Sequence, residues 1–361
     1  MVLEFEKARH WADEPPPWGD EWRALSRADI QRLYPAVYGQ PHNYLAISGG
    51  GSDGAFGAGL LAGWTEAGDR PEFVLVTGVS AGALTAPFAF LGPEYDDVLK
   101  KIASELTADE VYNERGIIKG VRKDGFASTE PLQALLAKYI DEEMMEKFAA
   151  EHRRGRRLNV VTTHLDSMRP MMWQLSAIAA SGRPGSLELI RKLILASASI
   201  PGLFTPVLIP VEADGERYDE LHVDGGAATQ VFIYPISVDF KEIIEKLEIQ
   251  GRPKVYIIRN GRLDPQHEHV ENKTMPIISR SLLSLTRTQG IGDLYRIYLE
   301  TMRDGLEFYR ASIPASFTMK EDEPFNTEYM RALFNVGYEA AKNGYPWEPT
   351  PPNMKNLPMG R

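Results

Sequence analysis

The sequence predicts an α/β protein, a three-layer sandwich in which helices cover both faces of a mainly parallel central sheet. Short runs rich in Val, Ile and Leu recur along the chain, and they alternate with longer segments of helical spacing. Continuous apolar strands that alternate with helices are typical of parallel sheets buried on both faces. Strands are expected at "YLAIS" (44–48), "FVLVT" (73–77), "LNVVTTHL" (158–165), "ELHVDGG" (220–226) and "KVYIIRN" (254–260).

The chain has 361 residues, enough for one large α/β domain or two ordinary ones. Residues 1–43 are expected to form an N-terminal arm, because three consecutive prolines interrupt regular structure there while Trp and Tyr side chains anchor it to the domain. Residues 44–320 are expected to form the main domain, with a charged helical insertion at about 96–157. Residues 321–361 are expected to form a C-terminal helix and tail packed on that domain.

A long stretch from 275 to 309 carries apolar residues at helical spacing and contains Gly290 and Gly292. Glycine weakens a helix interior, so we expect a break or kink near these two residues. In the insertion, the segment "HRRGRR" (152–157) is expected to be the end of a helix closed by Gly155, with its arginines placed favourably for the helix dipole.

The net charge and the absence of cysteine limit which partners and which chemistry the protein can use. The formal net charge is −10, which argues against nucleic acid because phosphate binding needs a basic surface. The same charge weakens attraction to an anionic membrane, so a lipid would be engaged through apolar surface. There is no cysteine, which excludes disulfides, thiolate catalysis and metal sites built from cysteine.

The N-terminal sequence is charged within its first few residues and lacks the apolar core of a secretory signal peptide. No run approaches the roughly 18 apolar residues of a membrane-spanning helix. We therefore expect a cytoplasmic protein.

A glycine-rich loop, "SGGGSDGAFGAG" (48–59), follows the first predicted strand. One set of its glycines fits the G-x-G-x-x-G of dinucleotide-binding folds, and another set, with Ser52, fits the G-x-S-x-G of serine hydrolases. A dinucleotide site also needs an acidic residue at the end of the next strand, to bind the ribose hydroxyl. The segment "LVTGVSAGAL" (75–84) contains no Asp or Glu. A nucleotide-binding, Rossmann-like protein is kept only as an alternative.

A second G-x-S-x-G, formed by Gly78, Ser80 and Gly82, stands where an apolar strand runs directly into a helix. This is the context of a nucleophile elbow, in which small neighbours relieve the crowding around a serine with strained backbone angles. Ser52 lies further beyond its strand, inside a glycine run. Ser80 is therefore the better candidate for a nucleophile.

The first loop then acquires a different role. Acyl transfer produces an oxyanion that preorganised N–H groups must stabilise, and glycines allow successive amides to approach a substrate closely. Neighbouring parallel strands end at the same edge of a sheet, so this loop and the elbow are expected side by side. We predict that Gly49, Gly50 and Gly51 form an oxyanion hole.

A serine nucleophile needs a base that accepts its proton. His267 and His269, in the polar segment "DPQHEHV" (264–270), could complete a triad. Asp224 is the other candidate, because it ends a short apolar strand and precedes two glycines that permit a tight turn. An aspartate at this position is also common in ordinary turns.

Four blocks in order, "SGGGSDGAFGAGLL", "GVSAG", "ASASIPGLFTPV" and "DGG", together resemble the patatin-like phospholipase family. The resemblance covers roughly residues 44–226 and implies a patatin-like catalytic domain over 44–320. It implies a lipid acyl hydrolase that uses a Ser-Asp dyad, here Ser80 and Asp224, without histidine, metal or cofactor. The implied partners are a lipid or small ester substrate and, transiently, a membrane surface. The segment 196–207 is expected to pack structurally and to offer an apolar wall to an acyl chain.

One position departs from the family pattern. The family usually carries a basic residue where this chain has Asp53, and such a residue could steady the loop or meet a phosphate. The negative charge at this position argues against a preference for phospholipids, whose phosphate is also negative. It also motivates a second alternative, a catalytically silent, patatin-like scaffold that binds lipid.

Overall fold

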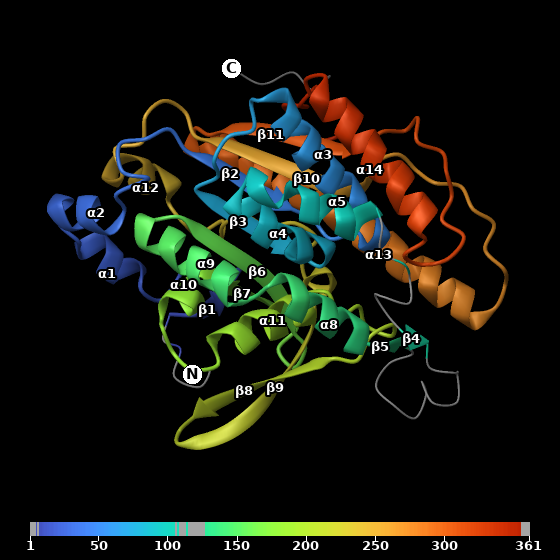
Figure 1. Ribbon diagram of the computed structural model, residues 1–361, viewed down its shortest axis with the longest axis horizontal. Coiled ribbons are helices and arrows are strands. Elements are labelled where there is room, and N and C mark those ends of the chain that lie inside the picture. The colour runs from blue at the N-terminus through green and yellow to red at the C-terminus, as the bar shows by residue number, and fades with distance from the viewer. Residues whose placement is uncertain (1–4, 6, 105–106, 108–112, 115–126, 355–361) are drawn as a thin grey trace.

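The predicted fold class is confirmed. The computed structural model, which describes residues 5, 7–104, 107, 113–114 and 127–354, is a mixed α/β protein with a nine-stranded sheet between two layers of helices (Figure 1). The expectations for the first residues of the arm, the middle of the insertion and the end of the tail lie outside the described residues.

The main sheet has the spatial order β1-β7-β6-β3-β2-β10-β11, and β9 pairs with both β6 and β8. The strands are β1 (Arg9–Trp11), β2 (Asn43–Ile47), β3 (Leu75–Val79), β6 (Arg157–His164), β7 (Arg169–Gln174), β8 (Val207–Ala213), β9 (Glu216–Asp224), β10 (Lys254–Arg262) and β11 (Glu307–Ile313). A separate pair joins β4 (Asn113–Glu114) to β5 (Ala127–Ser128). The five strands from β6 to β11 in this order are parallel.

One predicted strand runs in the other direction. The segment 220–226 was expected in the parallel series, but β9 is antiparallel to β6 and β8. The reason is the turn at Asp214 and Gly215, both of which have positive φ angles. An Asp-Gly pair with two positive φ angles makes a two-residue hairpin turn, so the chain returns at once instead of crossing over through a helix.

The helices pack on both faces of this sheet. They are α1 (Gly19–Ala24), α2 (Arg27–Leu33), α3 (Gly54–Ala67), α4 (Ala81–Leu91), α5 (Asp96–Ser104), α8 (Glu130–Tyr139), α9 (Glu142–Arg154), α10 (Leu175–Ala180), α11 (Ser186–Ser197), α12 (Phe240–Lys246), α13 (Thr274–Asp304) and α14 (Thr327–Lys342). Short 3-10 turns lie at η1 (Gly51–Asp53), η2 (Pro93–Tyr95) and η3 (Gly225–Ala227). No described helix has both the length and the apolar character needed to cross a membrane.

Alternating side chains of the central strands divide the core into two layers. In β2, Leu45 and Ile47 join the cluster that contains α3, α4 and α14, whereas Tyr44 and Ala46 face the cluster that contains α12 and α13. This alternation is what a pleated strand buried on both faces requires. The sheet thus holds the starts of α3 and α4 rigidly at its carboxyl edge.

The described parts of the N-terminal and C-terminal segments pack on the rest of the protein. In the arm, β1 pairs antiparallel with β7, and α2 packs with Leu247 and Ile249 in a small apolar cluster. At the other end, α14 crosses α3 at close range, because a Cβ on Gly59 would lie 2.0 Å from the Phe334 carbonyl oxygen.

The expected break near Gly290 and Gly292 is wrong. The segment forms one continuous helix of 31 residues, α13, and the rest of the stretch forms β11. Gly290 has a packing role instead: a Cβ there would lie 2.9 Å from Nη2 of the buried Arg259. Gly292 has nothing within 4 Å of the corresponding position.

These two glycines give a matched pair of substitutions. Gly292→Ala should raise the free energy of unfolding by up to about 1 kcal/mol, because alanine is the better helix former and meets no neighbour. Gly290→Ala should lower it by about 1–3 kcal/mol, because the methyl group displaces Arg259. Urea unfolding followed by circular dichroism measures both. Equal effects of the two substitutions would contradict the packing role of Gly290.

Candidate active site

The serine of the second G-x-S-x-G occupies a strained turn between β3 and α4. Ser80 has φ 54° and ψ −122°, a conformation that non-glycine residues rarely adopt. The turn is possible because its flanking glycines lack side chains: a Cβ on Gly78 would lie 2.4 Å from the Gly82 carbonyl oxygen, and one on Gly82 would lie 2.2 Å from that of Ile47. The sequence pattern and the local backbone geometry therefore agree on a nucleophile elbow.

The structure brings Ser80 and Asp224 together. The Ser80 hydroxyl donates a hydrogen bond to Oδ2 of Asp224 at 2.5 Å, and the backbone N–H of Gly226 donates to Oδ1 at 2.7 Å. The antiparallel course of β9 delivers this carboxylate to the end of β3. Both side chains of the pair are buried.

Burial sets the chemistry of this carboxylate. Loss of solvent raises the pKa of Asp224 to about 7, against the lowering effect of its two hydrogen bonds. Desolvation disfavours the charged form of a carboxylate, which is why its proton is held more tightly. A group with this pKa can both accept and return a proton near neutral pH.

The last residue of α11 and the segment that follows it fix both halves of the pair, a role that the sequence did not predict. Ser197 accepts a hydrogen bond from the Ser80 N–H at 3.1 Å and donates one to the Val161 carbonyl at 2.6 Å. The Ser199 carbonyl accepts from the Asp224 N–H at 2.9 Å. This segment begins the predicted structural block 196–207, whose small residues were the available signal.

The glycine loop lies directly beside the elbow, as predicted from neighbouring parallel strands. Residue pairs between β2 and β3 end at Ile47 and Gly78, and a Cβ on Gly49 would lie 3.0 Å from the Ser80 Cβ. The three glycines are not equivalent, however. The Gly49 N–H donates a hydrogen bond to the Gln230 carbonyl at 3.1 Å. This amide is therefore not free to bind an oxyanion, although the sequence predicted that role for it.

The next two amides are differently placed. The N–H groups of Gly50 and Gly51 donate to no acceptor within the part of the chain that the structure describes. The carbonyl of Gly49 accepts from Arg259 Nη1 at 3.1 Å and from the Ser48 hydroxyl at 2.7 Å. Since N–H and C=O point in opposite directions across a trans peptide, this clamp aims the Gly50 N–H away from Arg259.

Two neighbouring residues of β10 hold the base of the loop, and sequence reasoning missed both. Arg259 also donates to the Ser48 hydroxyl at 3.0 Å, and burial lowers its pKa. Asn260 donates from Nδ2 to the Ser48 carbonyl at 2.9 Å and accepts from the Gly57 N–H at 3.0 Å. The dipeptide "RN" at the end of an apolar strand was the only signal for this clamp.

Asp53 faces the C-terminal helix. Its Oδ1 accepts a hydrogen bond from the Tyr329 hydroxyl of α14 at 2.6 Å. Burial raises the pKa of Asp53 to about 6, while the Tyr329 hydrogen bond and the charges of Arg259 and Arg262 oppose the shift. These contacts favour the loop-supporting role among the two considered for this position.

The histidines lie elsewhere. His267 and His269 are exposed in the loop between β10 and α13, and Ser80 has no histidine among its hydrogen-bond partners in the described residues. A group of side chains with metal-ligand chemistry, not predicted from the sequence, consists of His164, Glu220 and His222, with ligand atoms within 4.8 Å. Arg9 forms a two-pronged salt bridge with the Glu220 carboxylate.

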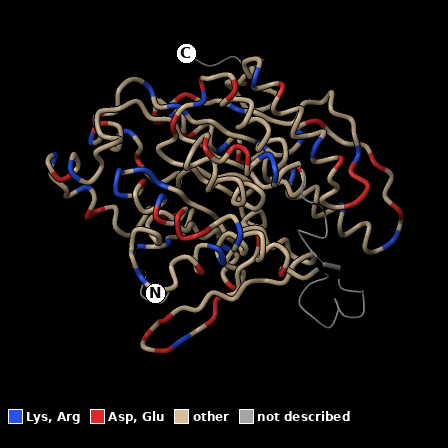
Figure 2. The backbone as a smooth tube through the Cα atoms, viewed as in Figure 1, with Lys and Arg blue, Asp and Glu red and all other residues tan. Residues whose placement is uncertain are grey.

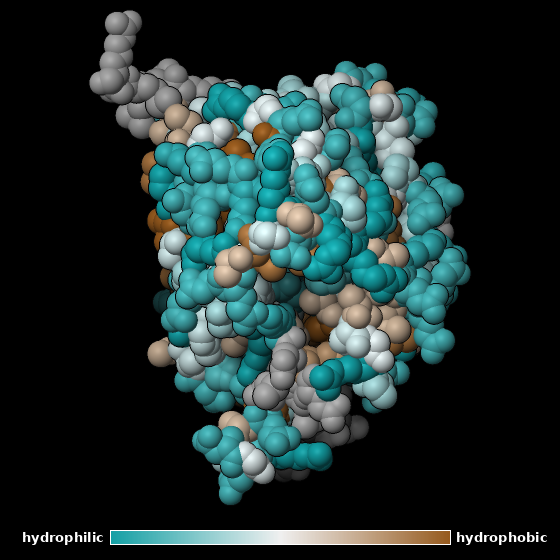
Figure 3. All heavy atoms as spheres, turned by 90° about the vertical axis from the view of Figure 1, so that its left-hand side faces the viewer, coloured by the Kyte–Doolittle hydropathy of each residue, from teal (hydrophilic) through white to brown (hydrophobic). Residues whose placement is uncertain are grey.

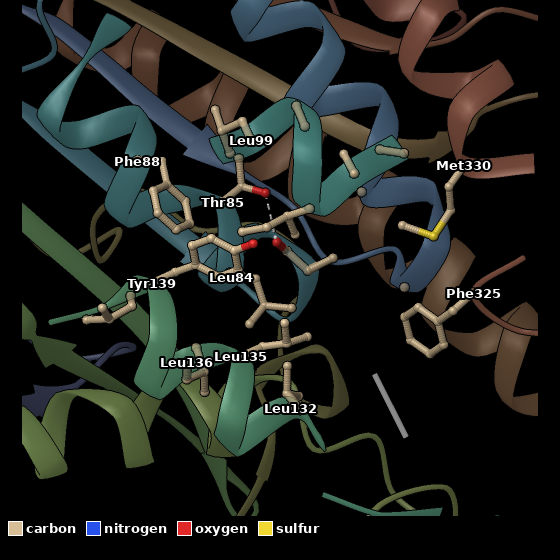
Figure 4. Close-up of a pocket in the computed structure, with 18 residues that line it drawn as sticks. Leu84, Thr85, Phe88, Leu99, Leu132, Leu135, Leu136, Tyr139, Phe325 and Met330 are labelled. Atoms are coloured by element: carbon tan, nitrogen blue, oxygen red, sulfur yellow. Dashed lines mark hydrogen bonds between the residues drawn. The ribbon is translucent and has the colours of Figure 1, made fainter. Parts of the chain in front are cut away.

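An apolar cavity of about 90 Å³ opens beside the loop and the elbow. Gly51 and Ala81 line the end near Ser80, while side chains of α4, α5 and α8 form its walls (Figure 4). Its polar hydroxyls belong to Thr85, which donates to the Ala81 carbonyl, and to Tyr139, whose hydroxyl has no hydrogen-bond partner among the described residues.

Charge is mixed over the rest of the molecule. Figure 2 shows basic and acidic residues interspersed along the described chain, without a basic stripe of the kind that binds nucleic acid.

Together, the fold and the strained turn at Ser80 have the geometry that a nucleophile elbow on an α/β sheet requires. The chain belongs to the patatin-like phospholipase family, whose family model matches residues 45–235, more than half of the chain.

The solved structures that match this chain include VipD from Legionella pneumophila and the type III effector protein ExoU. VipD is 12% identical with a TM-score of 0.41, and the match covers 84% of this chain and 66% of VipD. ExoU is 14% identical with a TM-score of 0.22, and the match covers 84% of this chain and 53% of ExoU. The chain thus spans less than two thirds of the length of either. No curated protein matches the chain.

The raised pKa of Asp224 has a consequence for stability. The folded protein binds this proton more tightly than the unfolded chain does, so the contribution of Asp224 to stability falls as the pH rises from its unfolded pKa through about 7. Asparagine does not titrate. The free energy of unfolding of the parent should lose this contribution over this range, whereas that of Asp224→Asn has no such contribution to lose. The difference, variant minus parent, should therefore rise by at most about 4 kcal/mol. Urea unfolding at stepped pH measures the difference, and a constant value would contradict a raised pKa.

Proposed function

We propose that this protein is a serine hydrolase that cleaves carboxyl ester bonds of lipids with a Ser80–Asp224 dyad and without metal or cofactor. Its catalytic domain spans residues 44–320. The observation that carries the proposal is the 2.5 Å hydrogen bond from the strained, buried Ser80 to a carboxylate whose pKa lies at about 7.

Acylation begins when Ser80 Oγ attacks the ester carbonyl carbon and its proton passes to Asp224 Oδ2. A carboxylate with an ordinary pKa is a weak base for this step, and the raised pKa improves it. The Gly226 N–H stays on Oδ1 throughout and keeps Oδ2 directed at the serine. When the tetrahedral intermediate collapses, the C–O bond to the alcohol breaks, and protonated Asp224 supplies the leaving oxygen with its proton.

The glycine loop stabilises the negative charge that develops on the carbonyl oxygen. We assign this role to the N–H groups of Gly50 and Gly51, since that of Gly49 is bonded to Gln230. Arg259 acts as a positioning residue, because it clamps the peptide that carries the Gly50 N–H. Preorganised donors of this kind are worth about 10²-fold or more in rate each.

Deacylation repeats the chemistry with water. Asp224, ionised again, accepts a proton from a water molecule whose oxygen attacks the acyl carbon, and the proton returns to Ser80 Oγ as the acid leaves. The apolar cavity beside Ala81 binds the acyl chain. Each buried methylene contributes about 0.8 kcal/mol, which favours lipid-like esters over acetate.

Labelling tests the identity of the nucleophile. A fluorophosphonate should react with the parent protein and with Ser52→Ala but not with Ser80→Ala, because Ser80 combines the strained turn with the buried Asp224 carboxylate, whereas Ser52 is hydrogen-bonded to Glu321 and to the Phe325 N–H. Peptide mass spectrometry locates the modified serine. A label on Ser52, or a folded parent that resists the reagent, would refute the assignment, and the latter result would favour a silent scaffold.

The pH profile tests the base. For a neutral ester such as p-nitrophenyl butyrate, kcat/KM should fall about tenfold per pH unit below an apparent pKa of about 7, because protonated Asp224 cannot accept the serine proton. Asp224→Asn should lower kcat by about 10⁴-fold. His267→Ala and His269→Ala serve as controls and should keep the parent profile. A histidine variant as inactive as Asp224→Asn would require a triad.

A further inference from the structure

The first half of α13 projects from the body of the protein. A helix of 31 residues is about 46 Å long, whereas the nine residues of β10 span about 30 Å. All buried residues of α13 lie from Gly290 onward, so the part before it is the overhang. Figure 1 shows this half extending past the ends of β10 and β11.

The overhang carries a group of exposed apolar side chains. Six large apolar side chains on it are between 44% and 66% exposed: Met275, Ile277, Ile278, Leu282, Leu283 and Leu285. We call these six the α13 apolar face. Four of them, at positions 275, 278, 282 and 285, follow the spacing of one helical stripe. Single exposed apolar residues are ordinary, but a contiguous group marks an interaction surface.

The two arginines of the overhang bind the loop that precedes α13. Arg280 pairs with Glu268 at 2.9 Å and donates to the Gln266 carbonyl, and Arg287 donates to the Leu263 carbonyl. Lys273, at the start of the helix, pairs with Glu271 at 2.6 Å. The α13 apolar face is therefore free of charge and locally neutral, on a chain whose net charge is −10.

The α13 apolar face lies at the same edge of the sheet as the dyad. A helix that connects parallel strands runs back along the sheet, so its first residue lies at the carboxyl edge where β3 and β9 end. The buried half of α13 also contacts the site: Asp293 accepts from the Gln230 N–H at 2.7 Å, and Gly290 packs on Arg259. The opposite end of the molecule, formed by α1, α2 and α12, is predominantly hydrophilic (Figure 3).

We propose that the α13 apolar face inserts into a zwitterionic lipid surface and holds the carboxyl edge of the sheet, with the dyad, against it. The choice of lipid as the partner rests on the hydrolase function proposed above, whereas the exposure of the α13 apolar face does not depend on it. Lipid is the occupant that fits, because the face is apolar, uncharged and at the same edge of the sheet as the Ser80–Asp224 pair. The negative net charge opposes anionic bilayers, so insertion and not long-range attraction drives binding.

Vesicle flotation tests the proposal with full-length Ser80→Ala, which leaves the lipid intact. This protein should float with phosphatidylcholine vesicles, equally well at low and high salt, and added phosphatidylserine should not strengthen binding. Adding Leu282→Ser, Leu283→Ser and Leu285→Ser should reduce the bound fraction at least tenfold. A matched control places Leu33→Ser, Leu208→Ser and Ile236→Ser on other exposed surfaces, and it should bind as the parent does.

Soluble substrate separates this proposal from the proposed function. With Ser80 intact, the triple α13 variant should hydrolyse p-nitrophenyl butyrate at the parent rate and lose phospholipid hydrolysis on vesicles. Unchanged flotation of the α13 variant, or no flotation of its parent, would overturn lipid docking even where ester hydrolysis is normal. A parent dimer that the α13 substitutions convert to monomers, seen by light scattering, would overturn it in favour of a second copy.

Discussion

Burial of the Asp224 carboxylate is the constraint on which the active-site end of the sheet depends. Burying a carboxylate costs free energy unless hydrogen-bond donors replace the lost water. Here the Ser80 hydroxyl donates to one carboxylate oxygen and the Gly226 N–H donates to the other. Its backbone is held equally firmly, by the Ser199 carbonyl and by the Thr163 hydroxyl, which donates to the Asp224 carbonyl at 2.9 Å. The same burial that makes this group costly raises its pKa toward 7, the value at which one carboxylate can serve as base and acid in turn.

Topology explains how three distant segments meet at this point. The parallel pairing of β2 with β3 places the glycine loop beside the elbow, and the β8–β9 hairpin returns the chain antiparallel so that β9 ends beside both. The β10 clamp and the buried half of α13 then hold the loop from behind. The glycine loop, elbow and carboxylate are thus carried by the rigid sheet, and the overhang of α13 extends from the same edge.

The sequence predicted those parts of the site that are marked by a pattern of neighbouring residues. Ser80 stands in a strand–glycine–helix pattern, and Asp224 became specific only through the order of four blocks along the chain. The oxyanion role of Gly49 could not be judged, because its competing acceptor, Gln230, comes from a loop distant in sequence. The clamp by Arg259 was missed for the same reason: a buried arginine has no periodicity, and its partners appear only after folding. The prediction of a kink in α13 was wrong because glycine occurs both where a helix breaks and where a neighbouring side chain packs closely on a helix.

A crystal structure of the covalent phosphonate adduct tests the central claim most directly, since the phosphonyl oxygen occupies the place of the oxyanion. The account predicts a bond from phosphorus to Ser80 Oγ, with the phosphonyl oxygen accepting hydrogen bonds from the N–H groups of Gly50 and Gly51. It also predicts that the Gly49 N–H remains on Gln230 and that Asp224 remains beside Ser80 Oγ. A phosphonyl oxygen bound away from the glycine loop, or a histidine ring in contact with the modified serine, would contradict the account.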